Sequence, residues 1–423
     1  MITLPLPQSL QIFGLLAILL LAGVAISPAD ESGSSQTRQG GEGFGGPSSV
    51  EEQLLEDREI RVEKIPRLGA FDDALQPWFD FKTGLQEDTG LTIGFDYTSL
   101  LMWASSSPGD DRGFGGIARM YGTWTLLDPG GPYTGSLVFK GENRHRLGTD
   151  TAPQNLGFVS GYNGIPGTAF SDYGWGVTNL FWRQSLGERF NLLVGQVDVT
   201  DYVDIYGLVN PWTQFQNLAF LTNPTIPVPN QGLGAAVGVS LTDHLYFVGG
   251  FSDANGDPTQ SPFSTFEEGE FFKHAEIGWV SSFERRYFDN VHLTAWQVDE
   301  REAAGVDDGW GLAVSATRFI DDTWMPFVRA GYADGDASLL SHSVSAGVGR
   351  YFDGTKDLLG VGVNWGRPAD GSLDDQWTSE LFYRFQAAQN FAITPSIQLI
   401  GNPALNSDKD FLAYFGLRAR VTF

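Results

Sequence analysis

The chain has 423 residues, of which 53 are glycine and none is cysteine, and its formal net charge is −25 at pH 7. The absence of cysteine excludes disulfides and thiolate metal sites, and the acidic balance argues against binding to nucleic acid. An aromatic content of 13% with a mean hydropathy of −0.14 indicates apolar and polar residues that alternate along the chain.

The first residues have the pattern of a secretory signal. The apolar run 12–26 is shorter than the ~20 residues that a transmembrane helix needs. It ends in the small-x-small pattern of 27–29, so we assign residues 1–29 to a signal peptide. No Lys or Arg precedes the run, which leaves an uncleaved membrane anchor as the alternative.

Residues 30–90 are expected to form a periplasmic linker with one short helix. Gly, Ser and acidic residues dominate 30–48, a composition that cannot bury a core. The helix is predicted over 49–64, where Ser49 and Glu52 have the spacing of a capping box. We expect no plug domain ahead of the first strand, because this region is short.

The last strand shows the clearest alternation. From Phe411 the odd positions are apolar and end at the aromatic Phe423, whereas the even positions include Arg418 and Arg420. A period of two with one apolar and one polar face fits a strand between lipid and water. The terminal aromatic residue resembles the feature by which barrel-assembly machinery recognises outer-membrane barrels.

The same period runs back to Leu91 and predicts sixteen strands. An open sheet edge cannot be satisfied in a bilayer, so strands that cross one must close into a barrel. We therefore predict an all-β fold, a closed antiparallel transmembrane β-barrel over residues 91–423, located in the bacterial outer membrane. The predicted strands are 91–103, 115–126, 134–146, 173–186, 190–199, 232–241, 244–253, 271–280, 290–299, 309–319, 324–332, 343–351, 357–366, 376–386, 391–400 and 410–423.

The connections between these strands alternate in length. They are short after even-numbered strands, as at 187–189 and 242–243, and mostly longer after odd-numbered ones, as at 147–172 and 200–231. The exception is 281–289, which is longer than the tight turn expected there. The alternation predicts short periplasmic turns and long extracellular loops. Sixteen strands also leave a water-filled lumen, which favours a channel.

The long segment 200–231 carries too many aromatic residues for a fully solvated loop, among them Tyr206, Phe215 and Phe220. We expect it to fold into the barrel mouth and to narrow it. The alternative is an external lid or a contact between subunits, and a homo-oligomer stays open.

The polar faces of the strands supply the candidate pore-lining residues. A charge on a lipid-facing position costs roughly 2–4 kcal/mol near the midplane, so these faces should point to the lumen. Lys140, Glu142 and Arg144 form a mixed-charge stripe that we expect at the constriction. The candidates are Lys140, Glu142, Arg144, Asn179, Arg183, Gln196, Asp198, Arg329, Glu380, Arg384, Gln398, Arg418 and Arg420.

Several short motifs point to one family. They are TNLFWRQ at 178–184, VGQVD at 194–198, NP at 210–211, FQN at 215–217, PVP at 227–229, GLG at 232–234, ITPSIQ at 393–398, NP at 402–403 and LRAR at 417–420. Together they resemble the carbohydrate-selective OprB-like porins over roughly residues 91–423. The resemblance implies sixteen strands, infolded loops and passive uptake of mono- and oligosaccharides. The family often has Lys where this chain has Gln196, which bears on solute preference.

Other functions are weighed against a sugar porin. A general or anion-selective porin would use the inward arginines, although Glu142, Asp198 and Glu380 offset them. A barrel enzyme would need a nucleophile–base pair. The histidines have no evident Ser or Asp partner in the sequence, and they are His145, His244, His274, His292 and His342.

The sequence predicts no catalytic residue, cofactor or metal site. The run 253–257 begins like a calcium loop, but Pro258 stands where such a loop needs glycine. We therefore expect small sugars and outer-membrane lipid as partners, and assembly machinery through Phe423.

Overall fold

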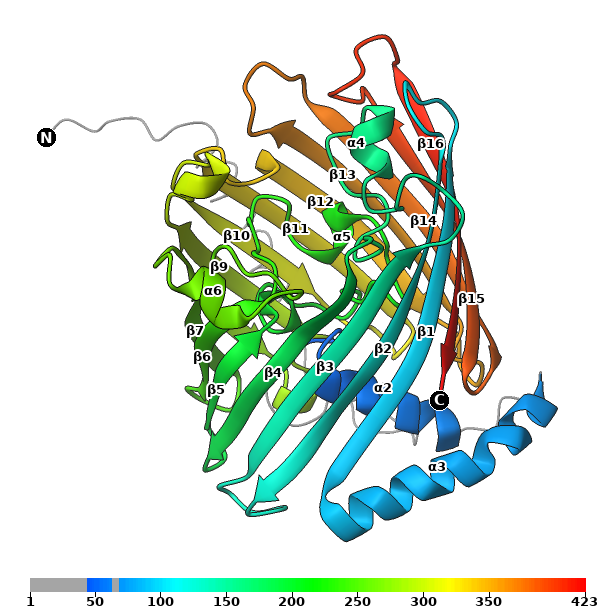
Figure 1. Ribbon diagram of the computed structural model, residues 1–423, viewed down its shortest axis with the longest axis vertical. Coiled ribbons are helices and arrows are strands. Elements are labelled where there is room, and N and C mark those ends of the chain that lie inside the picture. Colours follow the sequence, from blue (N-terminus) through cyan, green and yellow to red (C-terminus); the bar gives the residue numbers. More distant parts are fainter. Residues whose placement is uncertain (1–43, 63–67) are drawn as a thin grey trace, which may run out of the picture. The chain divides into compact units, whose positions relative to one another are not determined.

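A computed structural model describes residues 44–62 and 68–423 of the chain. The predicted signal peptide 1–29, and the linker residues 30–43 and 63–67, lie outside the described residues. Sixteen antiparallel strands form a closed barrel, in which each strand pairs with its neighbours in the chain and the first pairs with the last (Figure 1). The predicted fold class is confirmed.

Every predicted strand is present, with its ends displaced by a few residues. The strands are β1 (Leu91–Ala104), β2 (Arg112–Leu127), β3 (Gly135–Arg146), β4 (Gly174–Leu186), β5 (Phe190–Val197), β6 (Gly232–Ser240), β7 (Leu245–Asp253), β8 (Phe271–Val280), β9 (Asn290–Val298), β10 (Gly309–Thr317), β11 (Trp324–Asp334), β12 (Leu340–Tyr351), β13 (Leu358–Pro368), β14 (Gln376–Ala388), β15 (Phe391–Gly401) and β16 (Phe411–Thr422).

The alternation along the strands separates an apolar outer face from an inner face. On β16, Phe415 and Leu417 are 47% and 45% exposed, whereas Tyr414 and Arg418 are 0% and 1% exposed. Large apolar side chains are comparably exposed on the same face of most strands, so the outer face fits contact with lipid. The register pairs Leu101 of β1 with Leu417, which continues this face across the closure.

The alternation of connection lengths is also present. We call the end with the short connections the turn end, and the other the loop end. The unexpectedly long turn 281–289 contains the short helix η2 (Phe283–Arg285). The loop-end connections hold α4 (Leu156–Ser160), η1 (Val199–Asp201), α5 (Leu218–Leu221), α6 (Pro262–Phe266) and η3 (Glu302–Ala304).

Two helices precede the barrel in the part of the chain that the structure describes. The predicted helix is present as α2 (Val50–Val62), but the capping box is wrong. The Ser49 hydroxyl has no hydrogen-bond partner among the described residues, and the Glu52 carboxylate accepts hydrogen bonds from Arg286 and Tyr287. The reason is that Glu52 pairs with the barrel wall and not with its own helix terminus.

The second helix, α3 (Gly69–Thr89), was not predicted. Pro77 lies inside it and glycine occurs at position 84, and both residues have low helix propensity. It ends at Gly90, which has a left-handed φ of 71° and donates its N–H to Gln86 O. No helix in the described residues is long and apolar enough to cross a membrane.

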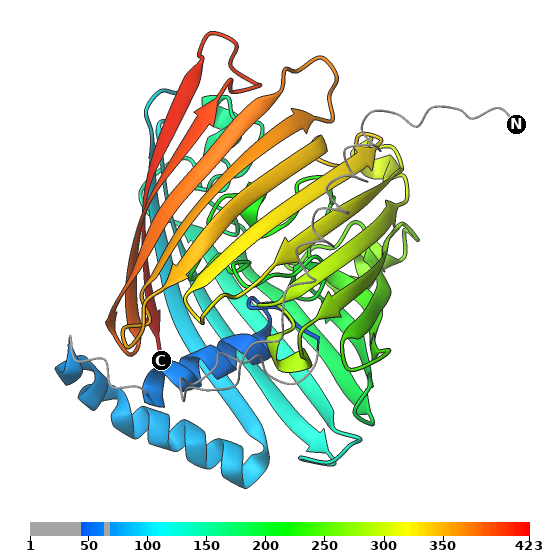
Figure 2. The ribbon, with the colours of Figure 1, turned by 180° about the vertical axis from the view of Figure 1, so that it is seen from behind.

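The helix α2 lies across the turn end of the barrel, within the ring of strands (Figure 1, Figure 2). Gln53 and Asp57 are buried, and Asp57 accepts a 2.6 Å hydrogen bond from Tyr121 of β2. The sequence analysis expected no plug domain ahead of Leu91 and did not predict that this short helix enters the lumen. The polar side chains of α2 meet polar partners on the strands around it.

Candidate functional site

The loop half of the barrel contains a cavity of about 850 Å³. Lys140, Glu142 and Arg144 of β3 are among the residues that line it. Loop residues, including Pro258 and Arg301, line it as well. Its volume lies within the range of about 300–1,000 Å³ that is typical of small-molecule sites.

Opposite charges face each other in this cavity. Lys140 Nζ lies 3.5 Å from an Asp201 carboxylate oxygen and 3.9 Å from Asp198. The Arg144 guanidinium lies 2.6 Å from Glu142 Oε2. The second Glu142 oxygen has no hydrogen-bond partner among the described residues. The cavity lining thus combines paired opposite charges, whose net field is small.

Asp201 and the neighbouring Tyr173 have shifted pKa values. Burial raises the pKa of Asp201 to about 7, although Lys140 opposes the shift. Burial and the nearby Glu142 carboxylate raise the pKa of the Tyr173 hydroxyl above its usual range, so it stays neutral. The Arg144 guanidinium lies 5.0 Å from the Tyr173 ring centre, which fixes both side chains at the cavity wall.

The connection between β5 and β6, residues 198–231, folds into the barrel, and we call it the infolded segment. Tyr206, Phe215 and Phe220 are fully buried and pack against Phe327 of β11 and Phe382 of β14. Figure 1 shows its helix α5 inside the ring of strands. The expected infolding is confirmed, and the external lid is excluded.

Two of the candidate pore residues hold this segment by its backbone. Glu380 accepts hydrogen bonds from the backbone N–H groups of Gln216 and Asn217, at 2.9 Å each. Arg418 donates to the carbonyl oxygens of Pro211 and Gln214, at 2.6 and 2.7 Å. Buried backbone groups need hydrogen-bond partners. Inside the barrel, these two side chains make the hydrogen bonds that water would otherwise make.

Gln398 and Arg329 have the same role. Gln398 donates to Pro166 O at 2.8 Å and so holds the neighbouring loop as well. Arg329 donates to Leu221 O at 3.2 Å and forms an ion pair with Asp204. Neither side chain lines the 850 Å³ cavity, so their polar groups are used to hold the loops inside the barrel.

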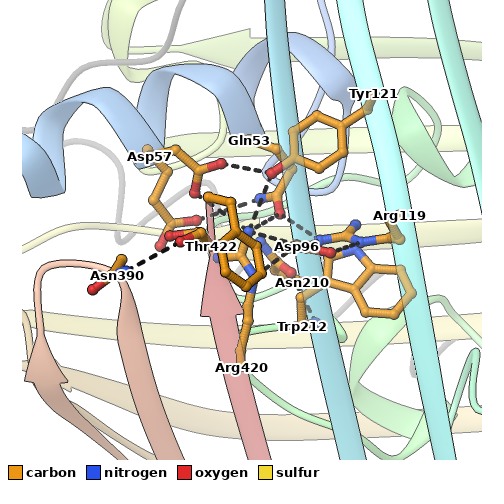
Figure 3. A network of polar contacts seen from close by, with 12 residues as sticks. Gln53, Asp57, Asp96, Arg119, Tyr121, Asn210, Trp212, Asn390, Arg420 and Thr422 are labelled. Atoms are coloured by element: carbon orange, nitrogen blue, oxygen red, sulfur yellow. Dashed lines mark hydrogen bonds and ion pairs between the residues drawn. The ribbon is translucent and has the colours of Figure 1, made fainter. Parts of the chain in front are cut away.

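A second group of candidates binds α2. Arg183 lies 3.0 Å from Glu51, and Arg384 lies 3.0 Å from Glu56. Arg420 contacts Asp57 at 3.3 Å and Asp96 of β1 at 2.8 Å, as Figure 3 shows.

The remaining candidates differ in their surroundings. Asp198 lines the cavity, and Asn179 donates to Asp201 at 3.1 Å. Gln196 donates to Val177 O at 2.7 Å on the neighbouring strand, and the structure does not place it against the cavity. Its register partner Leu180 is 48% exposed, whereas Gln196 itself is buried.

The sequence analysis did not name Asp201 or Arg119 as site residues. Asp201 lines the cavity together with Trp212, one of the aromatic residues of 200–231 that were expected to fold into the barrel mouth. Arg119 of β2 lies with its guanidinium carbon 3.9 Å from the Trp212 ring centre and pairs with Asp96 (Figure 3). Both Asp96 and Arg119 lie on polar faces of their strands, so the same alternation rule could have found them. The loop residue Asp201 carried no such pattern.

One histidine has an acidic partner that the sequence did not reveal. His292 Nε2 lies 3.1 Å from Asp204 Oδ1, and His292 Nδ1 lies 2.7 Å from Asn290. The His292 and Asp204 side chains are each 1% exposed and do not line the cavity. The pair therefore belongs to the attachment of the infolded segment.

A closed barrel of sixteen strands, narrowed from within by a folded segment and lined by paired charges, defines a porin. Residues 139–305 and 286–423 match the model of the carbohydrate-selective porin, OprB family. Because the match covers more than half of the chain, the protein belongs to this family.

A solved structure supports the fold. The high-pH structure of Pseudomonas putida OprB superposes with a TM-score of 0.64 at 14% identity, covering 82% of this chain and 97% of that one. The low-pH structure gives 0.48 at 12% identity over 82% and 97%. A mutant of Rh. blastica porin gives 0.46 at 11% over 79% and 100%. No curated protein sequence matches the chain.

Proposed function

We propose that the protein is an outer-membrane porin through which small carbohydrates diffuse passively into the periplasm. Membership of the carbohydrate-selective family supports the solute class. The observation that carries the proposal is the mixed-charge lining of the cavity, where Lys140 faces Asp201 and Glu142 pairs with Arg144.

Paired charges favour a neutral, hydroxyl-rich solute over an ion. A small net field gives neither cation nor anion much gain on entering the cavity. A sugar hydroxyl can donate to Glu142 and accept from Arg144 or Lys140, which replaces its bonds to water. The Trp212 ring at the cavity offers an apolar surface to the C–H face of a sugar.

The outer face supports the location. Large apolar side chains such as Val194, Leu293 and Val363 are 46–52% exposed on it, as lipid contact would require. We propose that this face contacts outer-membrane lipid, and that Phe423, 40% exposed at the turn end, is recognised by assembly machinery.

The nearest rival, an anion-selective porin, would need unpaired arginines in the lumen. Arg183, Arg384 and Arg420 each face a carboxylate of α2, which argues against it. The family and the fold define a transport channel and give no support to an enzyme.

Swelling of proteoliposomes tests the proposal. Glucose and maltose should enter faster than sodium gluconate of similar size, and millimolar sugar should reduce single-channel ion current. Equal rates for the sugars and the salt, with no current block by sugar, would contradict the proposal and favour a general porin.

A further inference from the structure

We infer that α2 and the wall residue Arg183 form a second constriction, at the turn end of the lumen, which limits the size and charge of the solutes that pass. This inference rests on the proposed porin function and adds a selectivity element to it. The argument combines the contacts of α2, the cavities on its two sides, and the charges between them.

The contacts of α2 come from all around the barrel. Glu51 binds β4, Gln53 and Asp57 bind β2 and β16, and Glu56 binds β14. Glu52 binds Arg286 in the long turn 281–289. A helix that lay along one wall could not reach strands on opposite sides of the ring, so α2 crosses the lumen. Both ribbon views agree with this placement (Figure 1, Figure 2).

Three cavities follow one another past this helix. The 850 Å³ cavity is lined by Ser48, two residues before α2, together with Asp198 and Asp201. A gap of about 30 Å³ shares both aspartates with it and is also lined by Glu51 and Arg183. Glu51 and Arg183 in turn line a turn-end cavity of about 200 Å³ between α2, α3 and β1. The gap is therefore the connection between the two larger spaces.

The gap is too small for a sugar. Its volume of about 30 Å³ is far below the range of about 300–1,000 Å³ that is typical of small-molecule sites. A pyranose ring is several times larger. Solute can pass here only when the groups on either side of the gap separate.

The Glu51–Arg183 pair borders the gap and is more exposed than the charged network on the other side of α2. Its side chains are 19% and 14% exposed and share a 3.0 Å hydrogen bond. On the other side of α2, Asp96 and Arg119 are 0% and 1% exposed, and Arg119 and Arg420 both contact Asp96 and Gln53 (Figure 3). Partly solvated ion pairs cost little to break, whereas buried charged networks cost much more. A buried charged network thus holds α2 on one side, and a less buried ion pair holds it on the other.

The charges on α2 also set the ion preference of this end. Its carboxylates at Glu51, Glu52, Glu56 and Asp57 face arginines of the wall. Loss of an α2 carboxylate leaves a wall arginine without its partner, and the turn end then attracts anions.

Single-channel recording on the full-length protein in salt alone tests this inference. We expect Glu51→Gln to raise conductance several-fold and to shift the reversal potential toward anions, and Arg183→Gln to raise conductance and shift it toward cations. The double variant should keep the raised conductance with a reversal potential near that of the wild type. Glu87→Gln removes the same charge from the exposed face of α3 and should change neither quantity.

Folding and function are checked separately. Heat-modifiable gel mobility shows whether each variant forms the barrel. As a second measurement, Glu51→Cys in this cysteine-free chain should lose conductance when a bulky thiol reagent is added from the turn side. Wild-type conductance and reversal potential in all folded variants, with no effect of the reagent, would overturn the constriction. Because these currents are carried by salt, a failure of sugar uptake alone would contradict the proposed function and leave this result intact.

Discussion

Arg329 on β11 and Asp204 in the infolded segment form an ion pair in which each side chain is only 1% exposed. Arg329 also lies 4.7 Å from the Tyr206 ring centre and donates to Leu221 O. The other Asp204 oxygen contacts His292 of β9. Arg329 therefore binds the infolded segment through an ion pair, a cation–π contact and a hydrogen bond to a backbone carbonyl. These contacts indicate a structural role, whereas the sequence pattern suggested a pore-lining one.

Removing Arg329 should destabilise the protein strongly. Breaking a buried pair leaves an uncompensated charge, which costs about 3–5 kcal/mol. We expect Arg329→Ala to lower the thermal midpoint of gel-mobility conversion markedly. The matched control is Arg367→Ala, whose pair with Asp375 is 52% and 37% exposed and is worth about 0–1 kcal/mol. Equal midpoints for the two variants would refute the structural role.

The stripe on β3 should control solute discrimination at the large cavity. Arg144→Ala leaves Glu142 without its 2.6 Å partner, so the reversal potential in a salt gradient should shift toward cations. Block by glucose or maltose should weaken by about 1 kcal/mol, the net value of one hydrogen bond. Glu142→Ala should shift the reversal potential in the opposite direction.

The control for this stripe lies two residues along the same strand. Arg146 pairs with Asp172 at the rim, where the two side chains are 42% and 34% exposed, so Arg146→Ala should leave block by sugar unchanged. If Arg144→Ala and Glu142→Ala retain wild-type block and selectivity, the stripe is ordinary wall and the discrimination lies elsewhere.

Ion selectivity should change with pH because of Asp201. Its pKa of about 7 makes the carboxyl neutral below that pH and negative above it, so cation preference should rise as pH increases through about 7. Asp201→Asn should remove this step. Asp257 lines the same cavity, and hydrogen bonds from Thr259 outweigh its slight burial and lower its pKa. Asp257→Asn should therefore shift selectivity at every pH and keep the step.

The same shift has a consequence for stability. Between the ordinary value of 3.8 and about 7, the folded protein binds a proton on Asp201 that the unfolded chain has released. The contribution of this group to the free energy of unfolding therefore falls as pH rises through that window. Asp201→Asn should flatten this part of the pH–stability curve, and an unchanged slope would contradict the assignment.

The orientation of the barrel can be tested with single cysteines, because the chain has none. Glu188→Cys lies in the short turn after β4, and Gly371→Cys lies in the loop after β13, and both positions are exposed. A membrane-impermeant maleimide should label Gly371→Cys in intact cells and Glu188→Cys only after permeabilisation. The reverse result would invert the topology. Asn217 is unsuitable as a probe, because it is fully buried.

The strands were predictable because their two faces meet different solvents. In β16 the contrast between Leu417 and Arg418 is visible in the sequence, and the structure gives them 45% and 1% exposure. The same alternation predicts that Arg418 points inward, but it does not predict which groups Arg418 contacts inside the barrel. Its partners are backbone carbonyls of Pro211 and Gln214, which are far away in the chain and carry no pattern.

The N-terminal region could be predicted only in part. A helix over 49–64 followed from local spacing, but its position in the lumen depends on charge pairs such as Glu56–Arg384 that join distant parts of the chain. The helix α3 was missed because Pro77 lowers the helix propensity of this segment. In the folded protein, tertiary contacts outweigh that low propensity. One such contact is Lys82, which donates to the backbone carbonyl of Phe423.

The infolded segment has a consequence for the order of assembly. It is synthesised before β14, β15 and β16, which supply Glu380, Gln398 and Arg418 as its partners. The segment is thus enclosed by strands that arrive later, and the seam between β1 and β16 closes around it. Once that seam has formed, the segment can leave only by giving up its buried backbone bonds within a closed ring. Closure of this seam should therefore raise the kinetic barrier to unfolding. The finished barrel should unfold far more slowly than its equilibrium stability alone would suggest.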